Sequence, residues 1–267
     1  MSLAAVRIGK ETFSKLIIGG NPFSGFSHQS PAKDDQMRHH YTTARIRETL
    51  LAAERLGITA HISRADHHVM RYLMEHWDQG GKMQWIAQTC PEVGSIERAI
   101  SNAIGGHAKA CYIHGGVMDN LVATGQTAEL PEAIARIRAA GMPAGIAGHK
   151  PEVFDWARKN LDVDFYMCSY YNPTSRDKNP EHVPGQKEWF HNDDRQRMAD
   201  LIQTLERPVI HYKVMAAGRN KPEEALAFVA KYLRPQDAVC IGVFTGDASN
   251  AMAENLKLLE QFLGRPA

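Results

Sequence analysis

The chain has 267 residues, and its 31 basic and 30 acidic residues give a formal net charge of +1. Charges of both signs are interspersed, so there is no electrostatic reason to expect nucleic acid or a membrane as a partner, and a small-molecule substrate is expected. There is no apolar run of about 18 residues. The first residues lack the charged-then-apolar order of a signal peptide. The four cysteines form no CxxC pair, and a cytoplasmic protein is therefore expected, with its oligomeric state left open.

Short apolar or β-branched runs alternate with longer amphipathic stretches along the whole chain. The clearest helices are 43–56 and 127–140, each followed by a glycine, and 248–263. Eight such βα units predict an α/β fold, a (β/α)8 TIM barrel forming a single domain over 1–267, with a doubly wound open sheet as the alternative. The predicted strands are 15–20, 58–63, 83–88, 109–114, 143–147, 163–168, 208–213 and 237–243.

Two long connections interrupt this alternation. Residues 21–42 follow the first predicted strand and residues 169–191 follow the sixth, and both are rich in Pro, Asn, Asp and His. In a barrel both would lie at the C-terminal face, where loops of this length usually serve function. We expect them to form a partial lid.

Chemistry in a TIM barrel belongs to residues at the C-terminal ends of the strands. His114 ends the fourth predicted strand before two glycines, which favours a functional role over a structural one. The run HISRADHH, residues 61–68, follows the second strand. There His61 is expected to be a hydrogen-bonded wall residue and Asp66 to cap the next helix, while Ser63, Arg64 and His68 are expected to face the site.

Small residues follow the last two predicted strands, where many barrels bind phosphate. Gly218 and Arg219 follow the seventh strand, and Thr245 and Gly246 follow the eighth before a helix. A phosphate-bearing cofactor or substrate fits this pattern. Asp247 would repel an anion, so an ordinary capped helix start is the alternative.

Several segments in order resemble motifs of the aldo-keto reductases. IIGGNPFSG looks like the family's LGxGTxxFGG, LGITAHISRADHH like LGxxxxDTAxxYG, and ACYIHGG like LxxIHxP. CSYYNP is similar to QxEYNP, and VIHYKVMAAG to VxAYSPLxxG. The resemblance implies the barrel fold and carbonyl reduction with a nicotinamide cofactor.

The same alignment implies altered catalytic residues. The family uses Tyr as a general acid, a Lys–Asp pair that lowers the Tyr pKa, and a His that orients the substrate. His114 matches the histidine, whereas Ser63 occupies the Asp position, His68 the Tyr position and Thr89 the Lys position. An imidazolium is a competent acid near neutral pH, so His68 is expected to replace the tyrosine as proton donor, with Ser63 and Arg64 beside it.

The resemblance also implies where a cofactor would bind. Tyr212 matches the aromatic residue that stacks on nicotinamide, and Cys168 occupies the position of a glutamine that binds its carboxamide. No Lys or Arg lies between Thr245 and Asn255 to pair with the 2′-phosphate of NADP, so NAD is as plausible as NADP. The predicted cofactor-binding residues are Asn21, Cys168, Tyr212, Lys213, Gly218, Arg219, Thr245, Gly246 and Asn255.

Three functions remain open at this stage. The first is an NAD(P)-dependent oxidoreductase acting on a small carbonyl or sugar-like substrate near His114 and His68. The second is a metal-dependent hydrolase, lyase or isomerase in which His114, His149 and His211 bind a divalent ion such as Zn²⁺. The third is a non-catalytic protein that binds a small molecule on the same scaffold.

Overall fold

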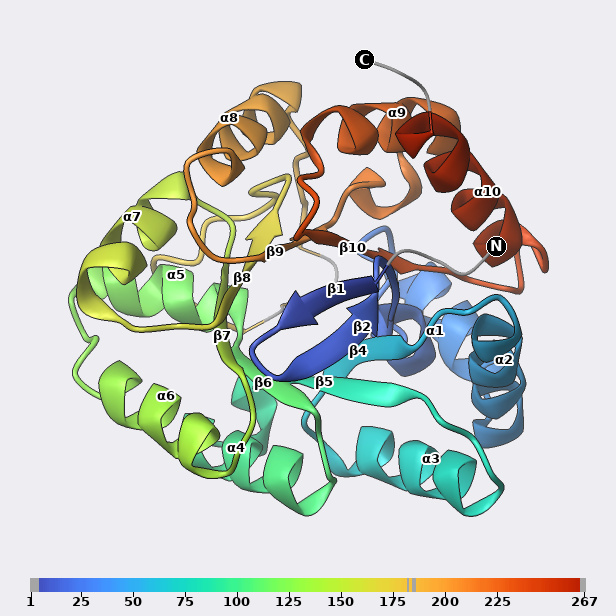
Figure 1. Cartoon of the computed structure of the whole chain (residues 1–267), viewed down its shortest axis with the longest axis horizontal. Helices are drawn as coiled ribbons and strands as arrows, with labels where there is room; N and C mark the ends of the chain where they lie inside the picture. The colour runs from blue at the N-terminus through green and yellow to red at the C-terminus, as the bar shows by residue number, and fades with distance from the viewer. Residues whose placement is uncertain (1–4, 182, 184–185, 265–267) are drawn as a thin grey trace.

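The computed structural model describes residues 5–181, 183 and 186–264, and its eight parallel strands close into a barrel. The strand order around the barrel is β10-β3-β4-β5-β6-β7-β8-β9 (Figure 1). This confirms the predicted TIM barrel and excludes the open sheet. The strands are β3 Leu16–Gly19, β4 Ala60–Arg64, β5 Gln84–Gln88, β6 Ala110–Ile113, β7 Ala144–Gly148, β8 Phe165–Ser169, β9 Val209–Tyr212 and β10 Ala238–Gly242.

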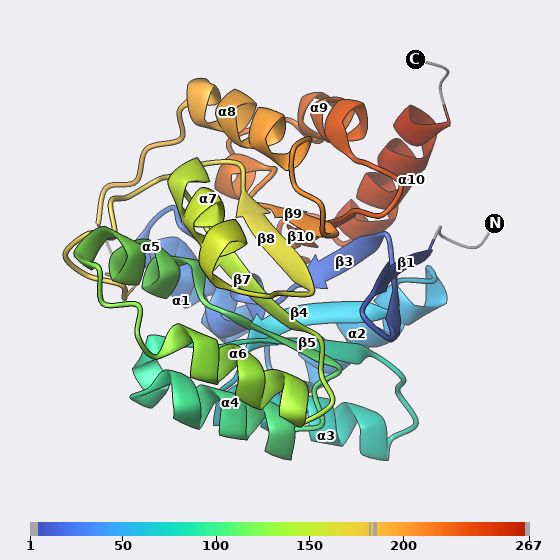
Figure 2. The same cartoon turned by 60° about the vertical axis from the view of Figure 1, so that its left-hand side comes forward.

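Helices surround the barrel on its outside (Figures 1 and 2). The helix predicted at 43–56 is α2, and those predicted at 127–140 and 248–263 are α6 and α10, each of which begins three residues later than expected. Among the described residues, no helix is long and apolar enough to cross a membrane. The helices are α1 Pro31–His40, α2 Thr43–Arg55, α3 His67–Asp78, α4 Ile96–Gly105, α5 Gly115–Thr124, α6 Leu130–Ala139, α7 Pro151–Asn160, α8 Asn192–Ile202, α9 Pro222–Tyr232 and α10 Ala251–Leu263.

An N-terminal hairpin, which the sequence did not lead us to expect, crosses the end of the barrel at which the strands begin (Figure 1). Its strands are β1 Ala5–Ile8 and β2 Glu11–Ser14, paired antiparallel. A Cβ at Gly9 would lie 2.9 Å from the side chain of Pro143, the residue just before β7, which places the hairpin at the N-terminal ends of the strands. Apolar side chains from both hairpin strands pack into the barrel interior, so this end is closed.

Strand alternation decides which side chains face the inside. On β9, Ile210 and Tyr212 pack with the interior cluster, whereas Val209 belongs to the larger cluster between strands and helices. Tyr212 therefore faces the axis and His211 faces the helices. We call the residues at and directly after the C-terminal strand ends the rim.

The two long connections both cover the C-terminal face. The first contains a 3-10 turn, Asn21–Ser24, and α1, while the described part of the second has no helix or strand between Ser169 and Asn192. Residues 182, 184 and 185 of the predicted lid lie outside the described residues. The connections meet where His28 Nδ1 lies 2.9 Å from the Glu188 carboxylate. Their position agrees with a cover over the rim, and the lid function stays a prediction.

Candidate active site at the C-terminal rim

His114 lies at the junction of β6 and α5, as the N-cap residue of that helix. Its backbone N–H donates to Thr89 Oγ1 at 2.9 Å, which fixes the junction. Its ring atom Nδ1 is buried and has no hydrogen-bond partner among the described residues. Burial, and then the neighbouring His149 and cationic side chains, hold the pKa of His114 well below its ordinary value. At neutral pH the ring is therefore uncharged, and Nδ1 keeps a hydrogen-bonding capacity that the described residues do not use.

A chain of three polar side chains runs beside His114. His149 Nδ1 lies 2.6 Å from Asp119 Oδ2, and the backbone N–H of His149 donates to Asp119 Oδ1 at 3.0 Å. On the other side of the ring, Nε2 lies 3.3 Å from the Tyr212 hydroxyl. Since the Asp119 carboxylate holds a proton on Nδ1, Nε2 accepts from the Tyr212 O–H. The three residues form a proton path from a buried carboxylate to a phenol at the rim.

Gly115, the first residue of α5, makes room for this path. A Cβ at Gly115 would lie 2.9 Å from the Tyr212 hydroxyl and 3.0 Å from His149 Cε1. The path therefore packs directly against the residue that follows His114. Burial, and then the charge of Asp119, hold the pKa of Tyr212 well above its usual value, so the phenol stays protonated at neutral pH.

Three cationic side chains face the same place. After burial and His149, the charges of Arg176, Arg64 and Lys213 each oppose protonation of His114. Burial lowers the pKa of Lys213 to about 8, against the opposing effect of Glu188, and its backbone has a positive φ of 56°. Lys213 Nζ lies 3.2 Å from His28 Nε2, where the two long connections meet.

Two residues of the HISRADHH run, His61 and Asp66, have the structural roles that the sequence predicted. His61 is fully buried in the wall, with Nδ1 3.1 Å from the Ile18 carbonyl and Nε2 2.7 Å from the Tyr72 hydroxyl. Asp66 caps α3 by accepting from the Val69 N–H at 2.9 Å. Both predictions are confirmed.

The members with predicted catalytic roles lie apart from one another. Ser63 is buried, and a Cβ at Gly20 would lie 2.7 Å from its Cβ and 2.8 Å from His61 Cε1, which places Ser63 beside the wall histidine. Arg64 pairs with Asp66 at 3.0 Å. His68 is exposed in the first turn of α3. Of the three, only Arg64 is found in electrostatic contact with His114. The proton-donor role of His68 stays a prediction.

The predicted histidine cluster for a metal does not form. His211 faces away from the axis, with Nδ1 2.9 Å from the Tyr170 hydroxyl and Nε2 3.3 Å from Asp237. Both of its ring nitrogens are engaged on the helix side, so it does not join His114 and His149. In the part of the chain that the structure describes, no group of three or more His, Cys, Asp or Glu is arranged to hold a metal ion.

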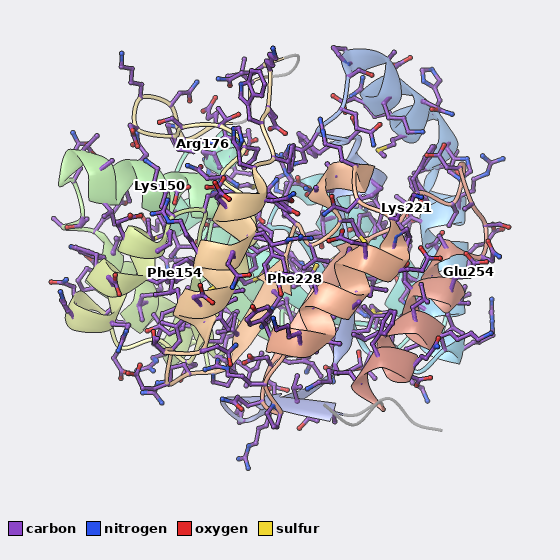
Figure 3. All side chains as sticks on the ribbon, turned by 90° about the horizontal axis from the view of Figure 1, so that it is seen from above. Lys150, Phe154, Arg176, Lys221, Phe228 and Glu254 are labelled. Atoms are coloured by element: carbon purple, nitrogen blue, oxygen red, sulfur yellow. The ribbon has the colours of Figure 1, made fainter. Side chains whose placement is uncertain are left out.

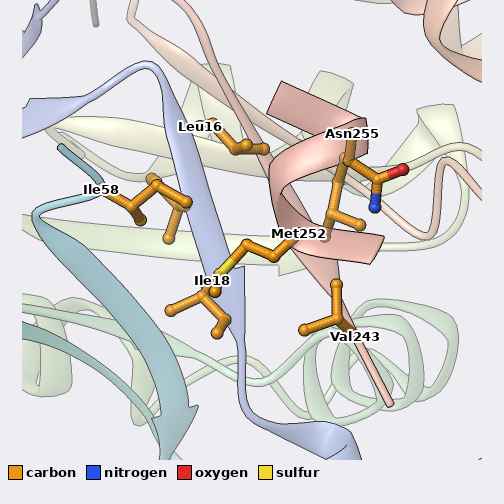
Figure 4. A pocket seen from close by; sticks show the side chains of 8 residues that line it. Leu16, Ile18, Ile58, Val243, Met252 and Asn255 are labelled. Carbon is orange, nitrogen blue, oxygen red and sulfur yellow. The ribbon is translucent and has the colours of Figure 1, made fainter. Parts of the chain in front are cut away.

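Two predicted cofactor contacts also lie on the helix side of the barrel wall. Cys168 belongs to the outer cluster, and burial raises the pKa of its thiol well above the usual value. The neighbouring Ser169 is the strand partner of Tyr212, and its Oγ donates to the Tyr171 carbonyl at 2.6 Å. Asn255 lines a small cavity between α10 and β3, with Leu16 and Met252 (Figure 4). Cys168 therefore faces the helices and Asn255 packs between α10 and β3, and the contact of either residue with a cofactor stays a prediction.

The other predicted cofactor contacts lie under the first connection. Arg219 donates to the His28 carbonyl at 3.0 Å, and Asn21 Nδ2 lies 3.3 Å from His28 Nε2. Thr245 Oγ1 lies 3.0 Å from His40 Nε2 of α1. Gly218 and Gly246 are exposed in the loops after β9 and β10. Asn21, Arg219 and Thr245 each contact a histidine of the first connection. The contact of these residues with a cofactor stays a prediction.

Sequence reasoning missed Asp119 and Arg176. Asp119 follows Gly115 by four residues on α5, and this spacing places both on one helix face. Once Gly115 is placed at the rim, that spacing is a usable signal for Asp119. Arg176 lies in an irregular segment, where no sequence period indicates burial.

A comparison with protein-family models gives no match, and a search of curated proteins gives none either. Solved structures match over nearly the whole chain. A proposed aldo-keto reductase from Pseudomonas aeruginosa has a TM-score of 0.66 at 14% identity, covering 97% of this chain and 96% of that one. A variant of Gox0644 in complex with NADPH has a TM-score of 0.58 at 9% identity, covering 100% and 97%.

Another match performs a different reaction. Phospho-2-dehydro-3-deoxyheptonate aldolase from Thermotoga maritima has a TM-score of 0.55 at 11% identity, covering 98% of this chain and 74% of that one. The likeness establishes a TIM barrel similar to aldo-keto reductases. At these identities it establishes the fold alone, so function has to be argued from the rim.

Proposed function

We propose that the protein is an oxidoreductase that moves a hydride between a nicotinamide cofactor and a small carbonyl or alcohol substrate. The observation that carries this proposal is the buried Asp119–His149–Tyr212 path, whose Tyr212 end packs against Gly115, the residue that follows His114. A hydroxyl–carbonyl interconversion needs a proton donor and acceptor at the substrate oxygen, together with a group that orients this oxygen. The rim supplies both.

The residues divide this work in the following way. In alcohol oxidation, Tyr212 takes the hydroxyl proton as it passes its own proton to His149 Nε2, and the Asp119 carboxylate stabilises the resulting imidazolium. In carbonyl reduction the proton moves back along the same path. His114 remains neutral and donates a hydrogen bond to the substrate oxygen. The phenol thus has a proton relay although no lysine is paired with it.

The residues at the rim fit a nicotinamide ring in two respects. Tyr212 faces the barrel axis and is partly exposed, so its ring offers a flat surface, and Ser169 is its partner on the adjacent strand. Tyr212 and Ser169 would hold the nicotinamide, with Arg219 and Thr245 on the side of the phosphates. The cofactor, NAD or NADP, would supply or accept the hydride.

A second candidate is an acid–base isomerase or lyase that uses the same path without a cofactor. It is favoured by the position of Cys168 on the helix side, by the packing of Asn255 between α10 and β3, and by the first connection, which contacts Arg219 and Thr245. Both candidates use His114, His149 and Tyr212. They differ in whether the protein binds a nicotinamide nucleotide.

Titration of NADPH and NADH, followed by nicotinamide fluorescence, separates the candidates. We expect saturable binding of at least one nucleotide to the wild type and loss of that binding in Tyr212→Ala. Tyr232→Ala is the matched control, since Tyr232 is the last residue of α9 and its hydroxyl bonds to Gln196 of α8. Absence of binding at millimolar nucleotide would overturn the proposal and leave the acid–base candidate.

A further inference from the structure

Arg176 is a buried cationic side chain in the second long connection. Only 6% of its surface is exposed, and its Nη1 donates to the carbonyl oxygen of Glu181. Among the described residues it forms no ion pair, whereas the neighbouring Lys150 pairs with Asp177 at 2.8 Å. Burial of a charged side chain is costly unless an opposite charge compensates it. The guanidinium therefore has the capacity to bind an anion.

The segment that carries Arg176 is fastened onto the start of α5. Asn120 Nδ2 donates to the carbonyl oxygens of Arg176 at 2.9 Å and Asp177 at 3.0 Å. A Cβ at Gly116 would lie 2.5 Å from the Pro180 carbonyl oxygen, so this contact requires the glycine. The fixed segment holds Arg176 on the C-terminal side of the molecule, opposite the hairpin (Figure 3).

The surroundings of the guanidinium add positive potential. The first backbone N–H groups of α5 have no partner within the helix, and they form its positive end. Arg176 acts on His114, Lys213 and Tyr212 alike, so its charge lies among the rim side chains. Two carboxylates of the rim have other partners, Asp119 with His149 and Glu188 with His28.

We propose that Arg176 and the start of α5 bind an anionic oxygen group of the substrate, so that the substrate is a small hydroxy or oxo compound carrying a carboxylate or a phosphate. A guanidinium binds either group through two parallel hydrogen bonds. The anionic group at Arg176 would place the rest of the substrate toward His114 and Tyr212. This inference rests on the proposed function for the reacting group, but the anion site itself does not require a nicotinamide.

The test uses two probe anions, malonate and inorganic phosphate, titrated calorimetrically into the full chain at low salt without any nucleotide. We expect saturable binding of at least one probe and a loss of about tenfold or more in affinity for Arg176→Gln. Binding of malonate alone assigns a carboxylate, and binding of phosphate alone assigns a phosphate. Arg158→Gln is the control, because this substitution makes the same change in net charge. Arg158 pairs with Glu206, just before β9, at the opposite end of the barrel.

Arg176→Lys keeps the proposal testable if the glutamine variant does not fold. It retains the charge but loses the two-point contact, so we expect binding weakened several-fold. Unchanged affinity in both Arg176 variants, equal loss in Arg158→Gln, or no saturable binding of either probe would overturn the anion site. Since no nucleotide is present, failure of the oxidoreductase proposal in the fluorescence titration leaves this result intact.

Discussion

His114 at the rim and the two histidines of the barrel wall, His61 and His211, differ in how their rings are hydrogen-bonded. His61 and His211 in the wall each engage both ring nitrogens, with Tyr72 and the Ile18 carbonyl in one case and with Tyr170 and Asp237 in the other. His114 at the rim leaves a buried nitrogen without a partner among the described residues. A fully bonded imidazole fixes structure, whereas an open one is available for a ligand. The hydrogen-bond state of the ring, rather than the residue type, separates His114 from His61 and His211.

The largest expected effect is on activity at the rim. His114→Ala removes the neutral donor at the substrate oxygen, and we expect kcat/KM to fall by about 10² to 10⁴. Because the ring makes no hydrogen bond that the fold depends on, urea unfolding should show a smaller loss of stability than the corresponding change in the wall. A fall in stability that accounts for all lost activity would show that His114 is structural.

The corresponding wall change should act on stability. His211→Ala leaves the Tyr170 hydroxyl without its partner and removes one bond from the buried Asp237, so we expect a loss of about 2–4 kcal/mol in the free energy of unfolding. Activity per folded molecule should change by less than about threefold, since His211 faces away from the rim. A catalytic loss as large as that of His114→Ala, in folded protein, would break the distinction.

The same distinction explains how much was predictable from sequence. All eight barrel strands were predicted because each apolar run is bounded by turn residues, and His61 and Asp66 followed from their positions at a strand end and a helix start. The side that a strand residue faces depends on register, which is why Cys168 and His211 were placed at the rim and lie in the wall. The N-terminal hairpin was missed because its two strands, of 4 residues each, are too short for an alternating pattern to be recognised.

A smaller effect is expected from the buried end of the proton path. Asp119→Asn keeps the shape of the side chain but no longer fixes the proton on His149 Nδ1, so kcat should fall by about 10- to 100-fold. KM should change little, because Asp119 does not contact the substrate. In a His149→Gln background, Asp119→Asn should cause no further loss, and additive losses in the double variant would contradict a shared path.

The smallest effect is a pH dependence of stability from Lys213. Its folded pKa of about 8 lies below the unfolded value of 10.5, so the charged lysine costs stability below pH 8, and this cost disappears as the pH rises toward 10.5. Lys213→Met should therefore stabilise the chain most near pH 7, by at most about 3 kcal/mol, and progressively less toward pH 10. Unfolding free energies of both proteins across this range provide the measurement. A stability difference that does not vary with pH would contradict the lowered pKa.

The most direct test of the contrast between rim and wall is a histidine ¹⁵N NMR titration of the wild type, with the rings assigned from His114→Ala, His61→Gln and His211→Gln. We predict that the pKa of His114 lies well below its ordinary value and that its ring nitrogens shift when NADPH or malonate is added, while those of His61 and His211 do not move. A His114 ring that titrates near its ordinary pKa and responds to neither probe would contradict the account.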